Sequence, residues 1–385
     1  MMDAVAKPDS RRKLLLLLCL LGIASFVFSV LCDPSRAYAN VLLATMYFLG
    51  ITLCGAFFLA LQYLTKGAWA VAIRRIPEAV TSFLPFAAVI MFIVWLGQPY
   101  LYEWIKPHGD ALLLTKIAYL NRPFFTIRLI IYFALWFFLV PKLVKVSLNQ
   151  DKDRDLVHTF AGMRWSAAYM IAFALTICFV AFDVIMSLEP HWYSTVFGIY
   201  YFAGSMLSCM AVLSLLVIIL RCQPDLKKVV SDTHVTLLAK LMLTFCIFWA
   251  YIWFAQFMLI WYTNMPEETA YFLRRFHHGW KPLFFANLFL NWVVPFLGLL
   301  GYRAKRNTKI VFTIAVVVLL GHWLDLYLMV MPSQMKNGPV FGFTELGIFA
   351  GVAALFTMVV LATFFSRPVY PKNDPLLEES IHVHE

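Results

Sequence analysis

The segment Asp183-Val-Ile-Met-Ser-Leu-Glu-Pro-His-Trp-Tyr-Ser-Thr195 combines two carboxylates, a histidine, a proline and two adjacent aromatic residues. It joins two long apolar runs, residues 167–181 and 196–220. A charged side chain near the centre of a membrane-spanning helix costs about 2.5–3.5 kcal/mol on insertion scales. We therefore expect Asp183 to have a specific role, and the rest of the chain to form the scaffold around it and its counterparts.

Apolar runs of this length recur along the whole chain. Of its 385 residues, 62% are hydrophobic and 14% are charged, whereas a soluble domain carries about 25% charged residues. A β-barrel would instead show alternating segments of about ten residues. Since each run can cross a ~30 Å hydrocarbon core as a helix, the sequence predicts an all-α polytopic membrane protein. Its ten transmembrane helices are expected near residues 14–32, 41–63, 78–97, 123–146, 163–187, 196–220, 236–262, 282–302, 310–331 and 342–365.

The net charge of +10 follows the predicted topology. Most of the 31 Lys and Arg residues lie in the N-terminal segment, the even-numbered connections and the C-terminal segment. This asymmetry is the positive-inside pattern and predicts that both termini are cytoplasmic. The basic excess therefore indicates orientation in a membrane, and not binding to nucleic acid.

The segments outside the helices lead to three further expectations. The first apolar run, after Arg11-Arg12-Lys13, resembles a signal peptide, but it is longer than the roughly 7–15 residues of a typical signal core, so we expect it to remain as an anchor helix. The long connection 98–121 is predicted to hold a helix in the membrane interface. The charged connection 149–155 and the tail after Pro368 are expected to be solvated and irregular.

Three short motifs occur in the same order in two parts of the chain. Tyr47-Phe-Leu-Gly50 matches Tyr201-Phe-Ala-Gly204, and Arg122-Pro123, followed by Arg128, matches Lys281-Pro282, followed by Asn287. Asp183, seven residues before Pro190, matches Asp325, seven residues before Pro332. A repeat of four helices is even, so both copies keep the same orientation in the membrane. We predict two tandem four-helix bundles, residues 41–190 and 191–335. Residues 1–40 and 336–385 would add a peripheral helix and a cytoplasmic tail at each end.

Titratable side chains lie inside the predicted helices near their outer ends: Arg128, Asp183, His322 and Asp325. His322 and Asp325 are three residues apart and share one helix face. Because such groups are costly to keep in a membrane, they indicate a polar pocket or proton pathway that opens outward. A structural alternative is that Arg128 pairs with Asp183 and ties neighbouring helices together.

Other polar residues lie in the outer connections. Glu189 and His191 are in a very short loop, where plain exposure is the simplest interpretation. Glu267 begins a segment that continues through Arg274, Arg275, His277 and His278, which suits a docking surface. A bis-histidine haem needs two histidines inside the spans, and only His322 is clearly intramembrane, so such a haem is excluded. The seven scattered cysteines include no Cys-x-x-Cys pair, which excludes a recognisable iron–sulfur or zinc motif.

Longer motifs resemble a known family: Met186-Ser-Leu-Glu-Pro-His-Trp-Tyr-Ser-Thr195, Gln256-Phe-Met-Leu-Ile-Trp-Tyr262, Met265-Pro-Glu-Glu268, Tyr119-Leu-Asn-Arg-Pro-Phe-Phe125, and His322-Trp-Leu-Asp325 with Met331-Pro332. Together they resemble the family of quinone-binding subunit 2 of bacterial alternative complex III, a quinol:cytochrome c oxidoreductase. The membrane part of that complex includes two paralogous NrfD-type, PsrC-like proteins, of which this family is one. The resemblance covers residues 40 to 370 and implies two four-helix bundles with two extra helices.

The resemblance also implies a function. The chain would be a subunit in the bacterial inner membrane that shapes a quinol or menaquinol environment or a proton pathway, with no covalently bound cofactor or redox centre of its own. The implied partners are the paralogous NrfD-like membrane protein, an iron–sulfur subunit, c-type cytochrome subunits, a terminal oxidase and lipid. The residues that match the family's polar positions are Asp183, Glu189, His191, Glu267, His322 and Asp325.

Three alternatives remain open. The chain could be the quinol-binding membrane anchor of a molybdenum or polysulfide reductase, which belongs to the same superfamily. It could be a standalone proton-coupled secondary transporter, although transporters place their sites at the midplane with broken helices and the polar residues here are shallower. It could also be a purely structural subunit.

Overall fold

The computed structural model describes residues 8–106, 109–335 and 337–383, with side chains from residue 12 onward. Within these ranges the chain is helical and contains no strand. Ten helical segments are long and apolar enough to cross a membrane, and they coincide with the ten predicted spans. The prediction of an all-α, multi-pass membrane protein is therefore confirmed.

Several spans are built from more than one helical element. The spans consist of α1 (Pro8–Cys32), α2 (Pro34–Thr65), α3 and α4 (Arg75–Thr81, Leu84–Leu96), α7 (Arg122–Gln150), α8 with η4 and η5 (Leu156–Val180, Ala181–Ile185, Met186–Leu188), α9 (Val196–Leu220), α11 (Asp232–Thr263), α13 with η6 and α14 (Lys281–Leu288, Phe289–Val293, Val294–Leu300), α16 (Thr308–Gln334) and α17 (Phe343–Phe365). The elements η4 and η6 are π-helical turns. Two of the described spans thus contain a π-helical turn, and the third span is interrupted between α3 and α4.

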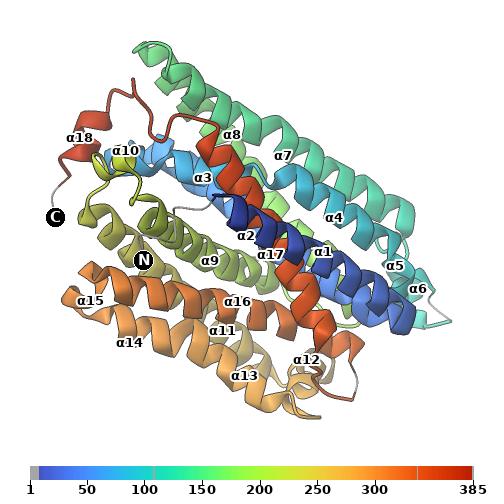
Figure 1. The fold of residues 1–385 in the computed structure, drawn as a ribbon. Coiled ribbons are helices and arrows are strands. Elements are labelled where there is room, and N and C mark those ends of the chain that lie inside the picture. Colours follow the sequence, from blue (N-terminus) through green and yellow to red (C-terminus); the bar gives the residue numbers. More distant parts are fainter. Residues whose placement is uncertain (1–7, 107–108, 336, 384–385) are drawn as a thin grey trace.

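Short elements in the connections mark two opposite sides of the molecule (Figure 1). One side carries η2 (Ala68–Ile73), α10 (Pro224–Lys227), α15 (Tyr302–Arg306) and α18 (Leu377–Ile381), and we call it the tail side. The other carries α5 (Gln98–Leu101), η3 (Glu103–Ile105), α6 (Ala111–Thr115) and α12 (Pro266–Phe276), and we call it the loop side. The candidate residues all lie toward the loop side.

The long helices pack in two groups of four. In the first group α2 contacts α3, α4, α7 and α8, and α7 packs against α8. In the second group α9 contacts α11 and α16, and the α13–α14 span packs between α11 and α16. The two groups meet where α2 contacts α9 and α16, and α8 contacts α9.

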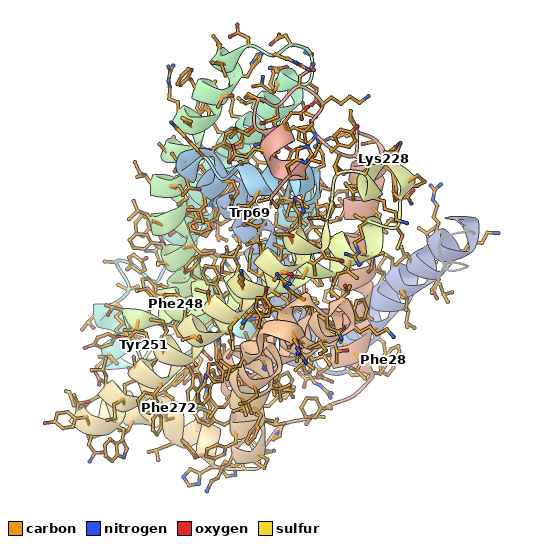
Figure 2. All side chains as sticks on the ribbon, turned by 90° about the vertical axis from the view of Figure 1, so that its left-hand side faces the viewer. Phe28, Trp69, Lys228, Phe248, Tyr251 and Phe272 are labelled. Carbon is orange, nitrogen blue, oxygen red and sulfur yellow. The ribbon has the colours of Figure 1, made fainter. Side chains whose placement is uncertain are left out.

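Helices α1 and α17 form a pair at the edge of the molecule, and Figure 2 shows α1 standing away from the two groups. Glycines allow this pair to approach closely, because a Cβ at Gly22 would lie 2.6 Å from the Cα of Gly351. At the loop-side end, Arg36 of α2 donates two hydrogen bonds to Glu345 of α17, at 2.7 and 2.6 Å. This bidentate pair anchors the edge helices to the central one.

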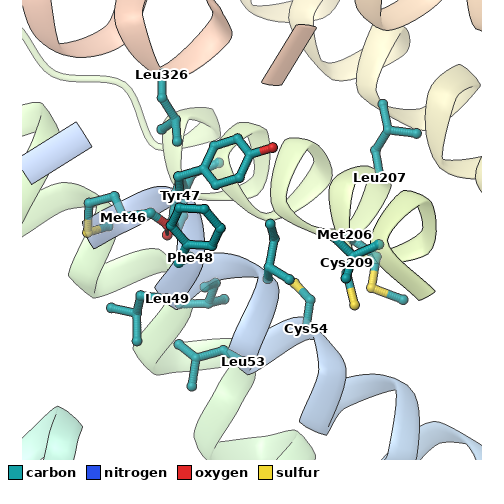
Figure 3. Packing of buried hydrophobic residues seen from close by; sticks show 14 of the residues in the cluster. Met46, Tyr47, Phe48, Leu49, Leu53, Cys54, Met206, Leu207, Cys209 and Leu326 are labelled. Atoms are coloured by element: carbon teal, nitrogen blue, oxygen red, sulfur yellow. Dashed lines mark hydrogen bonds between the residues drawn. The ribbon is translucent and has the colours of Figure 1, made fainter. Parts of the chain in front are cut away.

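The contact between α2 and α9 forms the centre of the core (Figure 3), where Cys54 of α2 lies toward Met206 and Cys209 of α9. The Tyr201 hydroxyl donates to the Met46 carbonyl at 2.7 Å. Transmembrane helices associate mainly through close packing and interhelical hydrogen bonds. Because α2 is almost wholly buried, it is the helix on which both groups assemble.

The recurring basic-proline motifs lie at equivalent helix starts. Pro123 and Pro282 each occupy the first turn of their helix, α7 and α13. A proline fits there because its missing N–H has no intrahelical partner in the first turn. Asn121 also caps α7 by accepting a hydrogen bond from the Phe124 N–H at 2.8 Å. These starts fix the depth of Arg128 and Asn287 in the two copies.

Two expectations for the connecting segments were wrong. Asp151, in the connection expected to be fully solvated, accepts a hydrogen bond from the buried Arg75, and its backbone carbonyl accepts from Asn373 at 2.8 Å. The tail forms the short helix α18, where Ser380 is buried and donates to the Trp69 carbonyl at 2.9 Å. Both segments are polar in sequence, but their polar groups form hydrogen bonds with backbone and guanidinium groups on the tail side.

Candidate functional site

Asp183 is 1% exposed and is surrounded by donors from the first group of helices. Its Oδ2 accepts hydrogen bonds from Arg128 Nε at 2.8 Å and from the Tyr132 hydroxyl at 2.6 Å. Its Oδ1 accepts one from the Tyr119 hydroxyl at 2.9 Å. A buried carboxylate needs both charge compensation and hydrogen bonds, and here it has both.

The Arg128 guanidinium is fixed from several directions. It donates to the Tyr119 carbonyl at 3.0 Å and lies 3.9 Å from the centroid of the Tyr119 ring and 4.5 Å from that of Phe124. Such cation–π contacts add to the ion pair. The structural pairing of Arg128 with Asp183, left open by the sequence, is therefore present. Arg128 Nη2 is buried without a hydrogen-bond partner among the described residues.

Asp325 occupies the corresponding place in the second group and is 0% exposed. Its Oδ1 accepts hydrogen bonds from the Tyr200 hydroxyl and from Asn287 Nδ2 (2.7 Å), and its Oδ2 accepts one from Trp249 Nε1 at 3.0 Å. All three donors are neutral, and no ion pair to Asp325 occurs within the described ranges. Asp325 can therefore gain or lose a proton without breaking an ion pair.

The equivalent helix positions thus hold different chemistry. Arg128 and Tyr132 of α7 correspond in the repeat to Asn287 and Asn291 of the α13–α14 span. Asn291 Nδ2 donates to Asn287 Oδ1 at 2.7 Å, which leaves the Asn287 amide free to donate to Asp325. In the first copy a cation and a hydroxyl hold the carboxylate, and in the second copy amides replace them.

His322 is also 0% exposed, and neither of its ring nitrogens has a hydrogen-bond partner among the described residues. It lies one helical turn from Asp325 on α16, and both side chains face Gly204 of α9. A Cβ at Gly204 would lie 3.0 Å from His322 Nδ1 and 3.2 Å from Asp325 Oδ2. The glycine therefore leaves room for the imidazole and the carboxylate to face the same point of α9.

The π-helical turns coincide with these polar positions. Asp183 lies within η4, and its carbonyl accepts a hydrogen bond from the Ser187 hydroxyl. Asn291 lies within η6. A π-turn inserts one extra residue into a helix and occurs frequently at functional sites. In this fold it reorients the polar side chain that each turn carries.

A small cavity extends from Asp325 toward the loop side. It has a volume of about 20 Å³ and is lined by Tyr200, Gln256, Tyr271, Arg275, Asn287 and Asp325 together with apolar residues. This space accommodates about one water molecule, and it is far smaller than the ~300–1,000 Å³ of ligand pockets. The cavity suits proton exchange and does not suit an organic ligand.

Glu189 lies at the loop-side end of this region and is 9% exposed. Its Oε1 accepts a hydrogen bond from Arg275 Nη2 at 2.9 Å, and its Oε2 lies 3.4 Å from Arg274 Nη1. Arg275 also donates to the carbonyls of Leu328 and Met329 near the end of α16. The expectation of an exposed Glu189 was wrong, because the two arginines of α12 enclose it. Arg275 itself is 2% exposed, so it contributes to packing and not to an outer docking surface.

A larger pocket lies beside Asp183 on the loop side. Its volume is about 330 Å³, and its lining includes Lys116, Ala118, Tyr119, Ser187, Trp192 and Tyr193. Burial lowers the pKa of Lys116 from its ordinary value, and burial with the nearby Asp183 carboxylate raises the pKa of Tyr119 to about 12. The hydroxyl of Tyr119 therefore stays protonated near neutral pH and acts as a donor between the pocket and Asp183.

Two of the candidate residues lie outside this arrangement. The His191 side chain is 49% exposed, and its Nε2 lies 3.1 Å from Asp110 Oδ2 at the loop-side surface. Glu267 is exposed in the first turn of α12. Among the residues that the structure describes, no three His, Cys, Asp or Glu side chains group as metal ligands would. The site therefore consists of two carboxylates with their donors, one imidazole and the two loop-side spaces.

Sequence reasoning missed the aromatic donors that complete both sites: Tyr119 and Tyr132 at Asp183, and Tyr200 and Trp249 at Asp325. In a chain with 17 tyrosines and 12 tryptophans, these residues resemble ordinary core or interface aromatics. The repeat could have indicated Tyr132, because Tyr132 lies nine residues after Pro123 and Asn291 lies nine residues after Pro282. A second missed group lies on the tail side, where the buried Arg75 pairs with Glu78 at 2.6 Å.

The Arg128–Asp183 pair generates a prediction for stability. Arg128→Ala would leave a buried, uncompensated carboxylate and is expected to destabilise the protein by about 3–5 kcal/mol. Replacing both partners, as Arg128→Met with Asp183→Leu, should cost much less, because no charge is left unpaired. Thermal unfolding in detergent measures the loss of stability in the single and the double variant, with Lys142→Ala on the same helix as the control. Equal losses for the single and double variants would contradict the pairing argument.

Known proteins provide no independent assignment of this site. Comparison with protein-family models and with curated proteins finds no match to the chain. The geometry and chemistry of the two buried carboxylates therefore carry the functional argument.

Proposed function

We propose that the chain is an integral-membrane subunit of a bacterial quinol:cytochrome c oxidoreductase of the alternative complex III type. The observation that carries the proposal is the duplicated buried aspartate, with a ligand-sized pocket beside Asp183 and a water-sized cavity beside Asp325. The motif resemblance in the loops and helices that hold these residues gives the class of complex. The tail side, which is rich in Lys and Arg, would face the cytoplasm of the inner membrane.

The pocket beside Asp183 suits the head group of a quinol or menaquinol. Its volume of about 330 Å³ falls within the range of small-molecule sites. The Trp192 and Tyr193 rings offer aromatic surface, whereas Tyr119 and Lys116 are polar groups that could orient ring hydroxyls. Quinol oxidation releases two electrons and two protons. The electrons would pass to redox centres on partner subunits, namely an iron–sulfur subunit and c-type cytochromes.

The second site suits proton transfer. Asp325 has only neutral donors, His322 has two unpartnered nitrogens, and the cavity leads toward Glu189 on the loop side. Proton transfer needs a group that can change its protonation state beside a space that holds water. In this proposal Asp325 exchanges protons with the cavity, and Arg275 keeps Glu189 in place at its outer end. Asp183 lies five residues from the loop-side end of its span, whereas transporters place their substrate sites near the midplane.

The quinol pocket is tested by filling it. Ala118→Trp places an indole in the pocket from an exposed lining position, whereas Ile117→Trp adds the same group at the neighbouring exposed position outside the lining. In the assembled complex, Ala118→Trp should raise the KM for quinol by about tenfold or more, and Ile117→Trp should stay near wild type. The same kinetics for both variants would contradict a quinol site. Purification without haem or iron–sulfur partners, but with transport activity, would contradict the class of complex.

The proton pathway is tested at Asp325. In proteoliposomes, Asp325→Asn, alone or with His322→Ala, should abolish the protons moved in excess of the one per electron that quinol oxidation itself releases, while quinol oxidation continues. Ser333→Ala on the same helix is the matched control, because Ser333 is buried but does not contact the site. Unchanged quinol oxidation with unchanged proton movement in an intact complex would indicate a purely structural subunit.

A further inference from the structure

A groove on the tail side has no part in the function proposed above. It lies where α2 ends, α8 begins and the C-terminal tail crosses between them, and its volume is about 220 Å³. One wall is polar and comes from Gln62, Tyr63, Lys66 and Arg74. The opposite wall is mostly apolar and comes from Leu156, Phe160 and Met163 of α8, with Pro375 and Leu376 of the tail.

The polar wall carries one uncompensated positive charge. Lys66 caps the end of α2 in the left-handed backbone region (φ 52°), and its side chain is exposed. No ion pair to Lys66 occurs among the described residues, whereas Arg74 is buried and pairs with Asp374. The one carboxylate in the lining is therefore engaged, and it is not available to a cationic ligand.

A second polar group in the wall lacks a partner. Gln62 is 9% exposed, and its Oε1 is buried without a hydrogen-bond donor among the described residues. A buried amide oxygen without a donor costs free energy, so a hydrogen-bond donor that reaches it would stabilise this wall. The tail that closes the groove is held by Ser380, which accepts a hydrogen bond from the Ala72 N–H at 3.0 Å. The groove is thus a fixed feature of the fold.

The apolar wall continues onto the membrane-facing surface of α8. Leu156, Val157 and Phe160 are 53%, 63% and 60% exposed. A soluble phosphate would gain nothing from this surface, and an apolar molecule would gain nothing from Lys66. An amphiphile that carries a phosphate uses both, because basic residues at a membrane surface attract anionic lipids by about fivefold in affinity per residue, equivalent to about 1 kcal/mol.

We infer that this groove binds one anionic phospholipid of the leaflet on the tail side. The Lys66 ammonium contacts the phosphate, the Gln62 amide contacts the head group, and one acyl chain follows Phe160 and Met163. A zwitterionic lipid binds more weakly, because Asp374 is already paired with Arg74 and cannot hold the lipid's own cation.

Native mass spectrometry of the protein purified from its membrane, with the subunits that accompany it, tests the inference. Phosphatidylglycerol and phosphatidylcholine are titrated separately, with inorganic phosphate as a competitor. The variants are Lys66→Ala, Lys66→Arg, and the control Lys228→Ala, a residue that is 72% exposed on the same side.

Lys66→Ala should weaken binding of one phosphatidylglycerol about fivefold, whereas Lys66→Arg and Lys228→Ala should stay near wild type. Three results would overturn the inference. These are equal affinity for phosphatidylcholine, no effect of Lys66→Ala, and displacement of the lipid by inorganic phosphate at similar affinity, which would identify a soluble phosphate site. Neither proton movement nor quinol oxidation enters this measurement, so its outcome is independent of the proposed function.

Discussion

The free energy needed to hold a carboxylate inside a membrane constrains the whole structure. Asp183 and Asp325 are both almost completely buried, and neither could remain there without several donors in place. The donors to Asp183 tie its span to α7 and to the connection before α7, and the donors to Asp325 tie α16 to α9, α11 and α13. The first group meets the requirement with a cation and two tyrosine hydroxyls, and the second group meets it with a tyrosine, an indole and an amide. The two groups of helices therefore hold their aspartates with different electrostatics.

This difference separates the possible roles of the two sites. The ion pair and the tyrosine hydrogen bonds at Asp183 hold one geometry, which suits a fixed wall beside a ligand pocket. Asp325 has no such counter-charge among the described residues and lies beside His322 and a cavity of about 20 Å³, which suits proton exchange. Glycines leave room for the second arrangement. A Cβ at Gly321 would lie 2.8 Å from Asn291 Oδ1, so a larger residue there would disturb the amide pair behind Asp325.

The sequence predicted the ten spans because long apolar runs have few alternatives to transmembrane helices. It also placed Arg128, Asp183, His322 and Asp325 inside apolar spans, where the structure has them. It could not predict which tyrosines and tryptophans donate to the aspartates, since burial and hydrogen bonding of aromatic residues depend on tertiary packing. Glu189 was misjudged for the same reason, because the arginines that enclose it lie 85 and 86 residues later in the chain.

The most direct test of the account is infrared spectroscopy of the carboxyl C=O stretch as a function of pH, in wild type, Asp183→Asn and Asp325→Asn. The account predicts a pH-dependent band from a protonated buried carboxyl group that is lost in Asp325→Asn and kept in Asp183→Asn, because Asp183 pairs with Arg128 whereas Asp325 has neutral donors among the described residues. A band that survives in Asp325→Asn, or that disappears in Asp183→Asn, would contradict the assignment of the two aspartates to different roles.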